Sequence, residues 1–370
     1  AQSMRSWFSF FERFDWILFF SVLALVGFGC LMIYSIGISQ EQTTIVRLNK
    51  QLIAAAMGLA AGGVLVWTDY RHARSVSVLG YLVGAALLAA VLVFGARING
   101  TSGWFQLGGL SFQPVEIAKV TLVLYLAAFF SRRARGQLSW RMFFLSGAAV
   151  GLYVFLIMLQ PDFGSAMVMI GSWLLLCLFV GLPPKAWIIL PLTAAILAGG
   201  AWEFGLQPYQ RDRILTFFEA ERDAQASGYN AMQARIAIGS GGWLGKGLGE
   251  GSQARLRFLP EASTDFIFSV LGEELGFVGI AVTLTLYGIV LCRLLWIGWT
   301  SEDDFAALFL VGTTGILMIH VFVNGGMNLG ILPITGIPMP FLSAAASSLL
   351  SFFLCIGVAE SIAVRRRTSG

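Results

Sequence analysis

Long apolar runs, separated by short polar connections, are the feature that most constrains how this chain can fold. They predict ten helices of membrane-spanning length, at residues 15–37, 48–68, 75–96, 113–131, 141–160, 162–181, 185–203, 265–297, 304–328 and 339–363. Only 12% of the 370 residues are charged, about half the usual share in a soluble domain. We therefore expect an all-α integral membrane protein that forms one polytopic domain over residues 1–370.

The positions of lysine and arginine predict how these spans are oriented. If the N-terminus lies in the cytoplasm, the inner segments carry many basic residues and the short outer connections carry few. The outer ones are Arg47, Lys50 and Arg97, and the inner ones are Arg5, Arg13, Arg71, Arg74, Arg132, Arg133, Arg135, Arg141, Lys185, Arg293, Arg365, Arg366 and Arg367. An even number of spans then returns the C-terminus to the cytoplasm. The net charge of +4 comes from such runs beside apolar segments, so we expect an inner-membrane protein and no nucleic-acid partner.

One connection is far longer than the others. Residues 204–264 separate the seventh and eighth predicted spans and fall on the outer side of the membrane. Loops of this length usually have a function. This loop is strongly basic, with Arg211, Arg213, Arg222, Arg235, Lys246, Arg255 and Arg257. We interpret it as a surface for an anionic ligand, and a solvated surface without a ligand is the alternative.

Polar side chains from several predicted spans fall at the same depth, near the outer ends. They are Glu116, Lys119, Asp162, Asp265, Asn324, Asn328, Ser343, Ser347 and Ser348. Glu116 and Lys119 are three residues apart and share one helix face. Ionisable groups inside a membrane segment are costly and mark functional sites. The pattern therefore predicts a polar cavity that opens toward the outer leaflet.

Each of these residues also has a structural interpretation. Glu116 and Lys119 could form an ion pair that only stabilises the bundle. Asp162 and Asp265 stand at predicted helix starts, where a carboxylate caps the helix or interacts with its dipole.

Three further features receive structural interpretations. Glu273 and Glu274 are expected about two helical turns deeper than Asp265, with at least one of them paired to a basic group. His320 stands alone on an apolar helix and is interpreted as a core histidine with satisfied hydrogen bonds. The glycine-rich run 239–251 lacks the spacing of a nucleotide-binding loop. It remains either a phosphate-binding nest or a close-packed loop, and we expect neither a nucleotide nor an organic cofactor.

Six motifs spread over nearly the whole chain are specific in combination. They are Phe112–Lys119, Gln160–Ser165, Gln233–Gly242, Phe258–Phe268, Gly272–Gly276 and Gly330–Pro340. Together they resemble the SEDS family (shape, elongation, division and sporulation proteins), which are peptidoglycan polymerases. Within it, the sequence Pro333-Ile-Thr-Gly-Ile337 is similar to the RodA-like elongation branch. The FtsW division branch usually has a Pro-Thr-Lys-Gly-Leu-type sequence there.

The resemblance implies ten spans, a large extracytoplasmic loop between the seventh and eighth, and a location in the bacterial inner membrane. It also implies a substrate, lipid II, which is a disaccharide-pentapeptide on undecaprenyl pyrophosphate. The reaction joins the GlcNAc 4-hydroxyl of one unit to the MurNAc C1 of another, and undecaprenyl pyrophosphate leaves. The implied partners are a class B penicillin-binding transpeptidase and the other membrane proteins of the elongation complex.

Residue roles follow from the same resemblance. The essential aspartate of the family matches Asp265, which we expect to be the general base for the hydroxyl. Inversion at the sugar carbon needs one base and no covalent intermediate. Glu116 and Lys119 carry over as a conformational or cavity pair, and Asp162 as a cavity residue.

The leaving pyrophosphate needs stabilisation by positive charge. Candidates are Lys119 and the loop residues Arg211, Arg213, Arg235, Lys246, Arg255 and Arg257. A divalent cation, Mg²⁺ or Mn²⁺, held partly by Asp265 or Asp162 is another route. The sequence does not choose between them.

The chain departs from the family pattern at two places. Ser263 stands where the family usually has histidine before Thr-Asp. The sequence Ser343-Ala-Ala-Ala-Ser347 replaces Ser-Tyr-Gly-Gly-Ser. Alanine does not easily replace glycine where the backbone needs a positive φ or a close approach. These changes predict either a wider or stiffer cavity wall or reduced activity.

Two other functions stay open. A lipid II flippase needs a polar path through both leaflets, whereas the inner halves of the predicted spans hold only Glu273, Glu274 and Glu360. A scaffold would only bind the transpeptidase, and the clustered polar residues argue against that function.

Overall fold

The computed structural model is a bundle of long apolar helices. It describes residues 11–366 except 39–40, 99–100, 108–109, 133–137, 201, 204–210, 212–226, 256–257 and 260. Within these residues, nine helices are long and apolar enough to cross a membrane. They are α2 (Trp16–Gly37), α3 (Glu41–Trp67), α5 (Ser77–Phe94), α6 (Pro114–Ser131), α7 (Trp140–Met158), α8 (Phe163–Val180), α13 (Ile267–Trp299), α14 (Asp304–Asn328) and α15 (Ala346–Arg365). The all-α membrane fold predicted from the sequence is confirmed.

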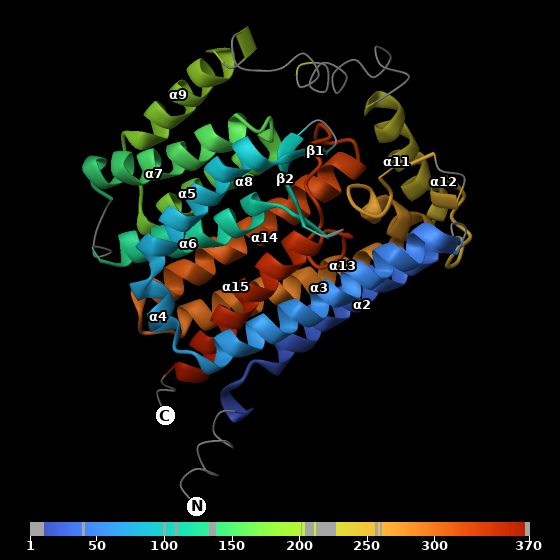
Figure 1. The fold of residues 1–370 in the computed structure, drawn as a ribbon, viewed down its shortest axis with the longest axis horizontal. Coiled ribbons are helices and arrows are strands. Elements are labelled where there is room, and N and C mark those ends of the chain that lie inside the picture. Colours follow the sequence, from blue (N-terminus) through green and yellow to red (C-terminus); the bar gives the residue numbers. More distant parts are fainter. Residues whose placement is uncertain are drawn as a thin grey trace, which may run out of the picture.

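The seventh predicted span is the one that differs most from expectation. It corresponds to α9 (Ala186–Gly200), which has 15 residues and contains Pro191. At 1.5 Å per residue this helix is about 22 Å long, shorter than a hydrocarbon core of about 30 Å. Figure 1 shows α9 at one edge of the bundle, beyond α7. The long loop follows it, and its described part contains α11 (Ser227–Gly241) and α12 (Ser252–Arg255).

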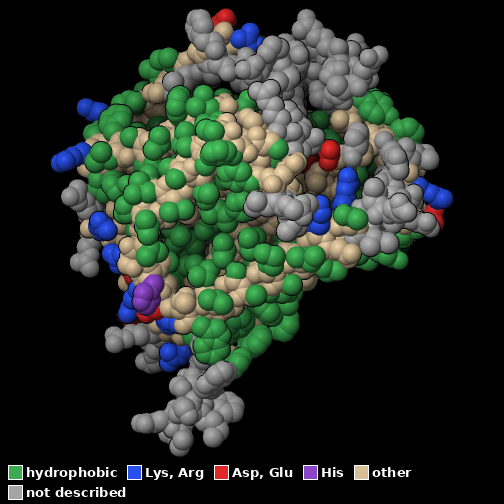
Figure 2. Space-filling model, in the orientation of Figure 1, with side chains coloured by type: hydrophobic (Ala, Val, Ile, Leu, Met, Phe, Trp, Pro, Cys, Tyr) green, Lys and Arg blue, Asp and Glu red, His purple; other side chains and the backbone are tan. Residues whose placement is uncertain are grey.

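The helices differ in how far their neighbours surround them. In α15, 89% of the 18-residue apolar segment is buried, against 67% in α6 and 61% in α14. The other six spans are buried over 28% to 44% of that segment. Figure 2 shows hydrophobic side chains over most of the flank of the bundle. Lipid can solvate those outer faces, so α6, α14 and α15 form the centre, and polar groups on them are enclosed by protein.

Both ends of the described chain lie at the same end of the bundle, called here the terminus end (Figure 1). Asp15 caps α2 by accepting a hydrogen bond from the Leu18 amide at 3.0 Å. Its carboxylate also forms an ion pair with Arg293 of α13, and its amide donates to Glu360 of α15. One residue therefore ties together three helices that are far apart in sequence. The opposite end, where α2 and α14 finish, is called the loop end.

A small antiparallel sheet lies between α5 and α6, with strands β1 (Ala96–Ile98), β2 (Thr101–Leu107) and β3 (Leu110–Phe112). The sequence interpretation missed it. The signals were the dipeptides Asn99-Gly100 and Gly108-Gly109, which are typical of two-residue hairpin turns. In the described strands, Ile98 pairs with Thr101 and Leu107 pairs with Leu110, so two residues separate the paired strand ends in each connection.

α13 is interrupted near its start. Gly276 has φ 68° and ψ −163°, a conformation open only to glycine, and the helix is kinked there. The glycine-rich loop packs against this break, since the Lys246 and Gly247 amides donate to the carbonyls of Glu273 and Glu274. The close-packed interpretation of the glycine-rich run is confirmed for this segment.

The kink overturns one expectation about depth. Glu274 accepts a hydrogen bond from Ser35, two residues before α2 ends, so it lies at the loop end. Glu273 pairs there with Lys246 at 2.7 Å. The two carboxylates are thus beside the outer loop rather than two turns deeper than Asp265. The error came from treating residues 265–297 as one straight helix.

The start of the tenth span was also placed too early. Residues 339–345 form a turn, in which the Ser343 amide donates to the Met339 carbonyl at 3.0 Å, and α15 begins only at Ala346. Pro340 lacks the amide hydrogen that a helix interior needs. Ser343 therefore precedes the helix, while Ser347 lies in its first turn.

The contact between α3 and α15 depends on two glycines. A Cβ added at Gly357 would lie 2.6 Å from the Gly62 carbonyl oxygen and 2.7 Å from its Cα, so two backbones meet without a side chain between them. Small residues at such crossings let transmembrane helices approach closely.

We expect Gly357→Ala to lower the melting temperature of the detergent-purified protein by several degrees. Overpacking of this kind costs about 1–3 kcal/mol, because the backbone on the other side cannot move aside. Gly63→Ala is the matched control, since a Cβ at Gly63 meets no atom within 4 Å. That variant should melt at or slightly above the wild-type temperature. Equal melting temperatures for the two variants would contradict the close contact.

Candidate active site

A polar cavity of about 370 Å³ opens at the loop end of the bundle. Its walls come from β2, β3, the residue before α6, the starts of α6 and α8, the turn before α13, and the segments before α15. The lining residues are Thr101, Trp104, Ser111, Gln113, Glu116, Lys119, Pro161, Asp162, Phe163, Gly164, Ser165, Glu261, Thr264, Asp265, Pro333, Ile334, Thr335, Gly336, Ile337, Pro338, Ala344 and Ala345. The polar cavity expected from the sequence is therefore present.

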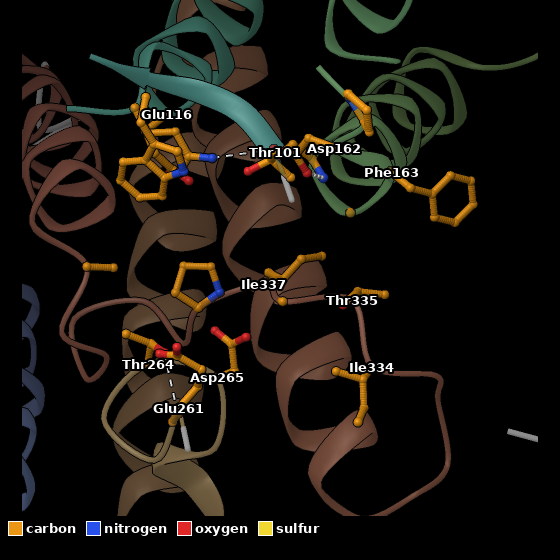
Figure 3. A pocket seen from close by; sticks show the side chains of 18 of the residues that line it. Thr101, Glu116, Asp162, Phe163, Glu261, Thr264, Asp265, Ile334, Thr335 and Ile337 are labelled. Atoms are coloured by element: carbon orange, nitrogen blue, oxygen red, sulfur yellow. Dashed lines mark hydrogen bonds between the residues drawn. The ribbon is translucent and has the colours of Figure 1, made fainter. Parts of the chain in front are cut away.

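Four of the predicted site residues meet in this cavity. Glu116, Lys119, Asp162 and Asp265 all line it, although they come from three separate helix starts. Figure 3 shows the Asp265 carboxylate pointing into the space between the elements, across from Asp162 and Glu116. Glu261, which the sequence interpretation did not select, lies beside Asp265 on the same turn and accepts a hydrogen bond from Thr264 at 3.2 Å.

Asp265 lies in a tight turn that two asparagines of α14 hold in place. Its amide donates to the Glu261 carbonyl at 3.1 Å. Its carbonyl accepts from the side-chain amides of Asn324 and Asn328, both at 3.0 Å. The cap of α13 is Phe266 and no side chain bonds there, so Asp265 does not act as the helix cap. Asn324 and Asn328 thus fix the main chain of Asp265 without lining the cavity.

The serines before and within α15 have a similar positioning role. The Ser343 hydroxyl donates to the Thr264 carbonyl at 2.6 Å and accepts from the Met339 amide at 2.8 Å. Ser347 accepts from the Gln113 amide at 3.0 Å. Both were predicted as cavity residues. They join the cavity walls to one another, whereas the residues that face the cavity are Ala344 and Ala345.

The alanines at 344–346 and Ser263, which depart from the family pattern, fit the structure without backbone strain. Ala345 has φ −128°, and among the described residues neither Ala344 nor Ala346 has a positive φ. Alanine is therefore accommodated here without backbone strain. Ser263 is buried and accepts a hydrogen bond from Arg47 of α3 at 3.0 Å. A cation from α3 thus lies one residue away from the Thr264-Asp265 pair.

Gly336 shapes the wall opposite the carboxylate. It has φ 73°, and a Cβ there would lie 3.5 Å from Asp265 Oδ2. The positive φ favours glycine here, whereas the distance to the carboxylate is an ordinary van der Waals contact.

Glu116 and Lys119 form the floor of the cavity. The Lys119 ammonium donates to Glu116 Oε1 at 2.9 Å, and the two residues are 3% and 2% exposed. Glu116 Oε2 is buried and has no hydrogen-bond partner among the described residues. The structural ion pair and the cavity role, which were alternatives in the sequence, are both present.

Asp162 likewise combines two roles. It caps α8, accepting from the Ser165 amide at 3.0 Å, which confirms the capping interpretation. Its second oxygen accepts from the Gln113 side chain at 3.4 Å and faces the cavity.

The basic residues predicted in the outer loop have other partners. Lys246 pairs with Glu273 at 2.7 Å, and Arg211 donates to the Glu203 carbonyl at 2.9 Å. Arg235 is exposed on α11, with its guanidinium against Gly330. Arg255 faces Glu250 at 3.6 Å. None of these four lines the cavity, and Arg213, Arg222 and Arg257 lie outside the described residues.

No group of three or more histidine, cysteine, aspartate or glutamate side chains at metal-binding distance occurs in the part of the chain that the structure describes. Asp265 and Asp162, the two residues proposed from the sequence, line the cavity from different walls.

A family model described as "Cell cycle protein", covering FtsW, RodA and SpoVE, matches residues 15–368. The chain belongs to the SEDS family. "Peptidoglycan glycosyltransferase MrdB" of Escherichia coli K12 is 35% identical over 94% of this chain and 92% of its own length. "Probable peptidoglycan glycosyltransferase FtsW" of Thioalkalivibrio sulfidiphilus is also 35% identical, over 96% of this chain and 90% of its own.

Two solved structures resemble this SEDS protein over nearly its full length. One, reported as "Structural coordination of polymerization and crosslinking by a peptidoglycan synthase complex", has a TM-score of 0.80 at 32% identity and covers 95% of this chain and 98% of the other. The crystal structure of the rod shape determining protein RodA of Thermus thermophilus has a TM-score of 0.70 at 30% identity, with 96% and 98% covered.

The ion pair of Lys246 with Glu273 indicates that this lysine stabilises the fold rather than binding substrate. Glu273 is fully buried and Lys246 is 32% exposed. Lys246→Ala leaves a buried carboxylate without its cation, which we expect to destabilise the protein by about 1–3 kcal/mol, less than a fully buried pair because solvent screens the lysine.

The measurement is a thermal melt of the detergent-solubilised protein, with Arg255→Ala as the matched control. Arg255 and Glu250 are both more than half exposed, so that variant should melt at the wild-type temperature. An unchanged melting temperature in Lys246→Ala would show that the ion pair is not structural.

Proposed function

We propose that this SEDS protein is an inverting peptidoglycan glycosyltransferase that polymerises lipid II at the outer face of the inner membrane. The observation that carries the proposal is one carboxylate, Asp265, held by its main chain at the wall of a polar cavity whose floor carries Lys119. The names of the relatives at 35% identity support the same activity.

The proposed chemistry needs one base. The 4-hydroxyl of the acceptor sugar is a poor nucleophile, and the Asp265 carboxylate accepts its proton as the oxygen attacks C1 of the donor. The C1–O bond to pyrophosphate breaks on the opposite face, and undecaprenyl pyrophosphate leaves with the electron pair. A direct displacement inverts the configuration at C1 and needs no covalent enzyme intermediate.

Positive charge assists the leaving group. Lys119 is enclosed by protein, where a fixed ammonium interacts more strongly with an anion than in water. Glu116 neutralises part of that charge, so exposed cations near the mouth of the cavity are needed as well. Arg47, bonded to Ser263, and Arg235, against Gly330, are the described candidates.

The proposed orientation places the cavity in the outer leaflet. The terminus end of the bundle carries Arg74, Arg293, Arg365 and Arg366, each bonded to groups at the ends of the spans. Such residues favour the cytoplasmic side. Both termini are then cytoplasmic, and the cavity lies at the depth of the sugars and pyrophosphate of lipid II.

We also propose a class B penicillin-binding transpeptidase and the elongation complex as partners. One of the similar structures is reported as a peptidoglycan synthase complex that joins polymerisation and crosslinking. The motif Pro333–Ile337, which lines the cavity, favours the elongation branch, although the MrdB and FtsW relatives are equally similar in overall identity.

A lipid II flippase remains the second candidate, and the structure weakens it further. Glu273 and Glu274 lie at the loop end, so they do not mark a path through the inner leaflet. Between the Glu116–Lys119 pair and the Asp15–Glu360 contact, the buried described residues carry no further carboxylate, ammonium or guanidinium group. A charged head group would find little compensation along that route.

Asp265→Asn should reduce polymerisation of labelled lipid II by about 10²–10⁴-fold, the range for loss of a general base. The assay uses purified protein with its cognate transpeptidase and resolves glycan strands on a gel. Glu261→Gln is the matched control, because it removes a carboxylate from the same turn and should retain most of the activity. Loss in Glu261→Gln with retention in Asp265→Asn would assign the base to Glu261 instead.

The proposed divalent cation has its own test. Mg²⁺ and Mn²⁺ usually bind one or two carboxylates together with substrate phosphate oxygens, and Asp265 and Asp162 are the residues that would hold the ion. It would neutralise charge on the pyrophosphate. EDTA should abolish polymerisation, and Mg²⁺ or Mn²⁺ should restore it. Calorimetry should detect Mn²⁺ binding only with a lipid pyrophosphate present. Full activity in EDTA would remove the cation from the mechanism.

A further inference from the structure

His320 is a buried ionisable side chain directly behind Lys119, and the proposed reaction does not use it. It lies on α14 and is fully buried. Its Nε2 is 3.1 Å from Lys119 Nζ, and its Nδ1 is 3.1 Å from the Pro338 carbonyl oxygen. The Phe352 ring meets the imidazole edge to face at 5.3 Å, which further restricts its orientation.

The two contacts define where the ring hydrogen is. A carbonyl oxygen only accepts, so Nδ1 must carry the hydrogen and donate it to Pro338. The Nε2 lone pair then faces Lys119, and the ammonium donates to it. The sequence interpretation of a core histidine with satisfied hydrogen bonds is confirmed, and His320 is not alone, because its partner is a cavity residue.

The imidazole therefore holds Lys119 from one side and Glu116 holds it from the other. An ammonium has three hydrogens. One is directed to Glu116 Oε1 and one to His320 Nε2, so the direction of the third is fixed as well. Lys119 lines the cavity, whereas His320 does not.

The same stretch of α14 also fixes Asp265. Asn324, one helical turn after His320, donates to the Ile337 carbonyl at 2.8 Å and to the Asp265 carbonyl at 3.0 Å. The carbonyls of the adjacent wall residues Ile337 and Pro338 thus bond to Asn324 and His320, which lie one helical turn apart on α14. This turn sets Lys119 and Asp265 relative to one another.

We propose that His320 is a positioning residue, which acts as a neutral acceptor to aim the Lys119 ammonium at the pyrophosphate of lipid II. The inference rests on the proposed function and assigns a specific atom, Nε2, to it. Filling the space of the ring is not enough for this role, because the acceptor must lie at the far edge of the side chain.

Two substitutions separate the two hydrogen bonds. In His320→Gln, the amide reaches the position of Nε2 and its oxygen accepts from Lys119. In His320→Asn, the shorter amide reaches only the position of Nδ1 and donates to Pro338. Both variants lose the ring and retain one polar contact, so their melting temperatures should be similar.

The experiment measures lipid II binding and polymerisation for the full-length protein with its cognate transpeptidase. His320→Gln should stay within about threefold of wild type in both assays. His320→Asn should lose about 10- to 100-fold in kcat/KM and bind a fluorescent lipid II more weakly, the range for losing one hydrogen bond to a charged group. If His320→Asn fails to fold, His320→Met replaces it as a side chain of similar length with a poor acceptor, and it should show the same loss.

Equal activity and equal binding in the glutamine and the acceptor-deficient variants would overturn the role of His320. If wild type binds lipid II but makes no glycan, the proposed function fails. The binding comparison of the glutamine and asparagine variants still decides the role of His320 in that case. If wild type neither binds nor polymerises lipid II, both proposals are wrong.

Discussion

Irregular backbone inside a membrane bundle must find its hydrogen-bond partners within the protein, because lipid offers none. Two such segments reach into this bundle, the turn 261–266 and the stretch 333–345. α14 supplies their partners through the side chains of His320, Asn324 and Asn328, which lie at four-residue intervals on one helix face. These contacts permit a cavity at the loop end of the bundle, and the placement of Asp265 and Lys119 depends on them.

The cavity walls are joined by side chains that do not face it. Ser343 bonds Thr264, Ser347 bonds Gln113, and Asn324 bonds Ile337. Small residues such as Ala344, Ala345 and Gly336 line the cavity between these contacts. The bonds made by Ser343, Ser347 and Asn324 hold the walls in place. The alanines at 344–346 therefore do not disturb the backbone, although the family usually has other residues there. In the proposed reaction, Lys119 is the lining residue that supplies positive charge to the leaving group.

Much of this arrangement was predictable from the sequence because apolar run length and polar position report directly on membrane depth. The spans, the cavity and its residues Glu116, Lys119, Asp162 and Asp265 followed from that argument. The predictions that were wrong concern the backbone geometry at the ends of the spans and between them. The Gly276 kink reversed the inferred depth of Glu273 and Glu274, and hairpin dipeptides in a short connection were overlooked. The ion pair of Lys246 with Glu273 could not be predicted either, because the sequence position of a loop lysine does not define which carboxylate lies near it.

The turn that carries Asp265 is held from two sides, which fixes the main chain of this half-buried residue. At its start, Ala344 donates to the Ser263 carbonyl, and α14 bonds the Asp265 carbonyl. Beyond it, the glycine-rich loop bonds the main chain on both sides of Gly276, and Lys246 neutralises Glu273. Since α13 is broken at Gly276, its first two turns are free to follow the loop rather than the axis of the span. The basic outer loop thus supports the helix that follows the Asp265 turn, and Lys246 supports it through the ion pair with Glu273.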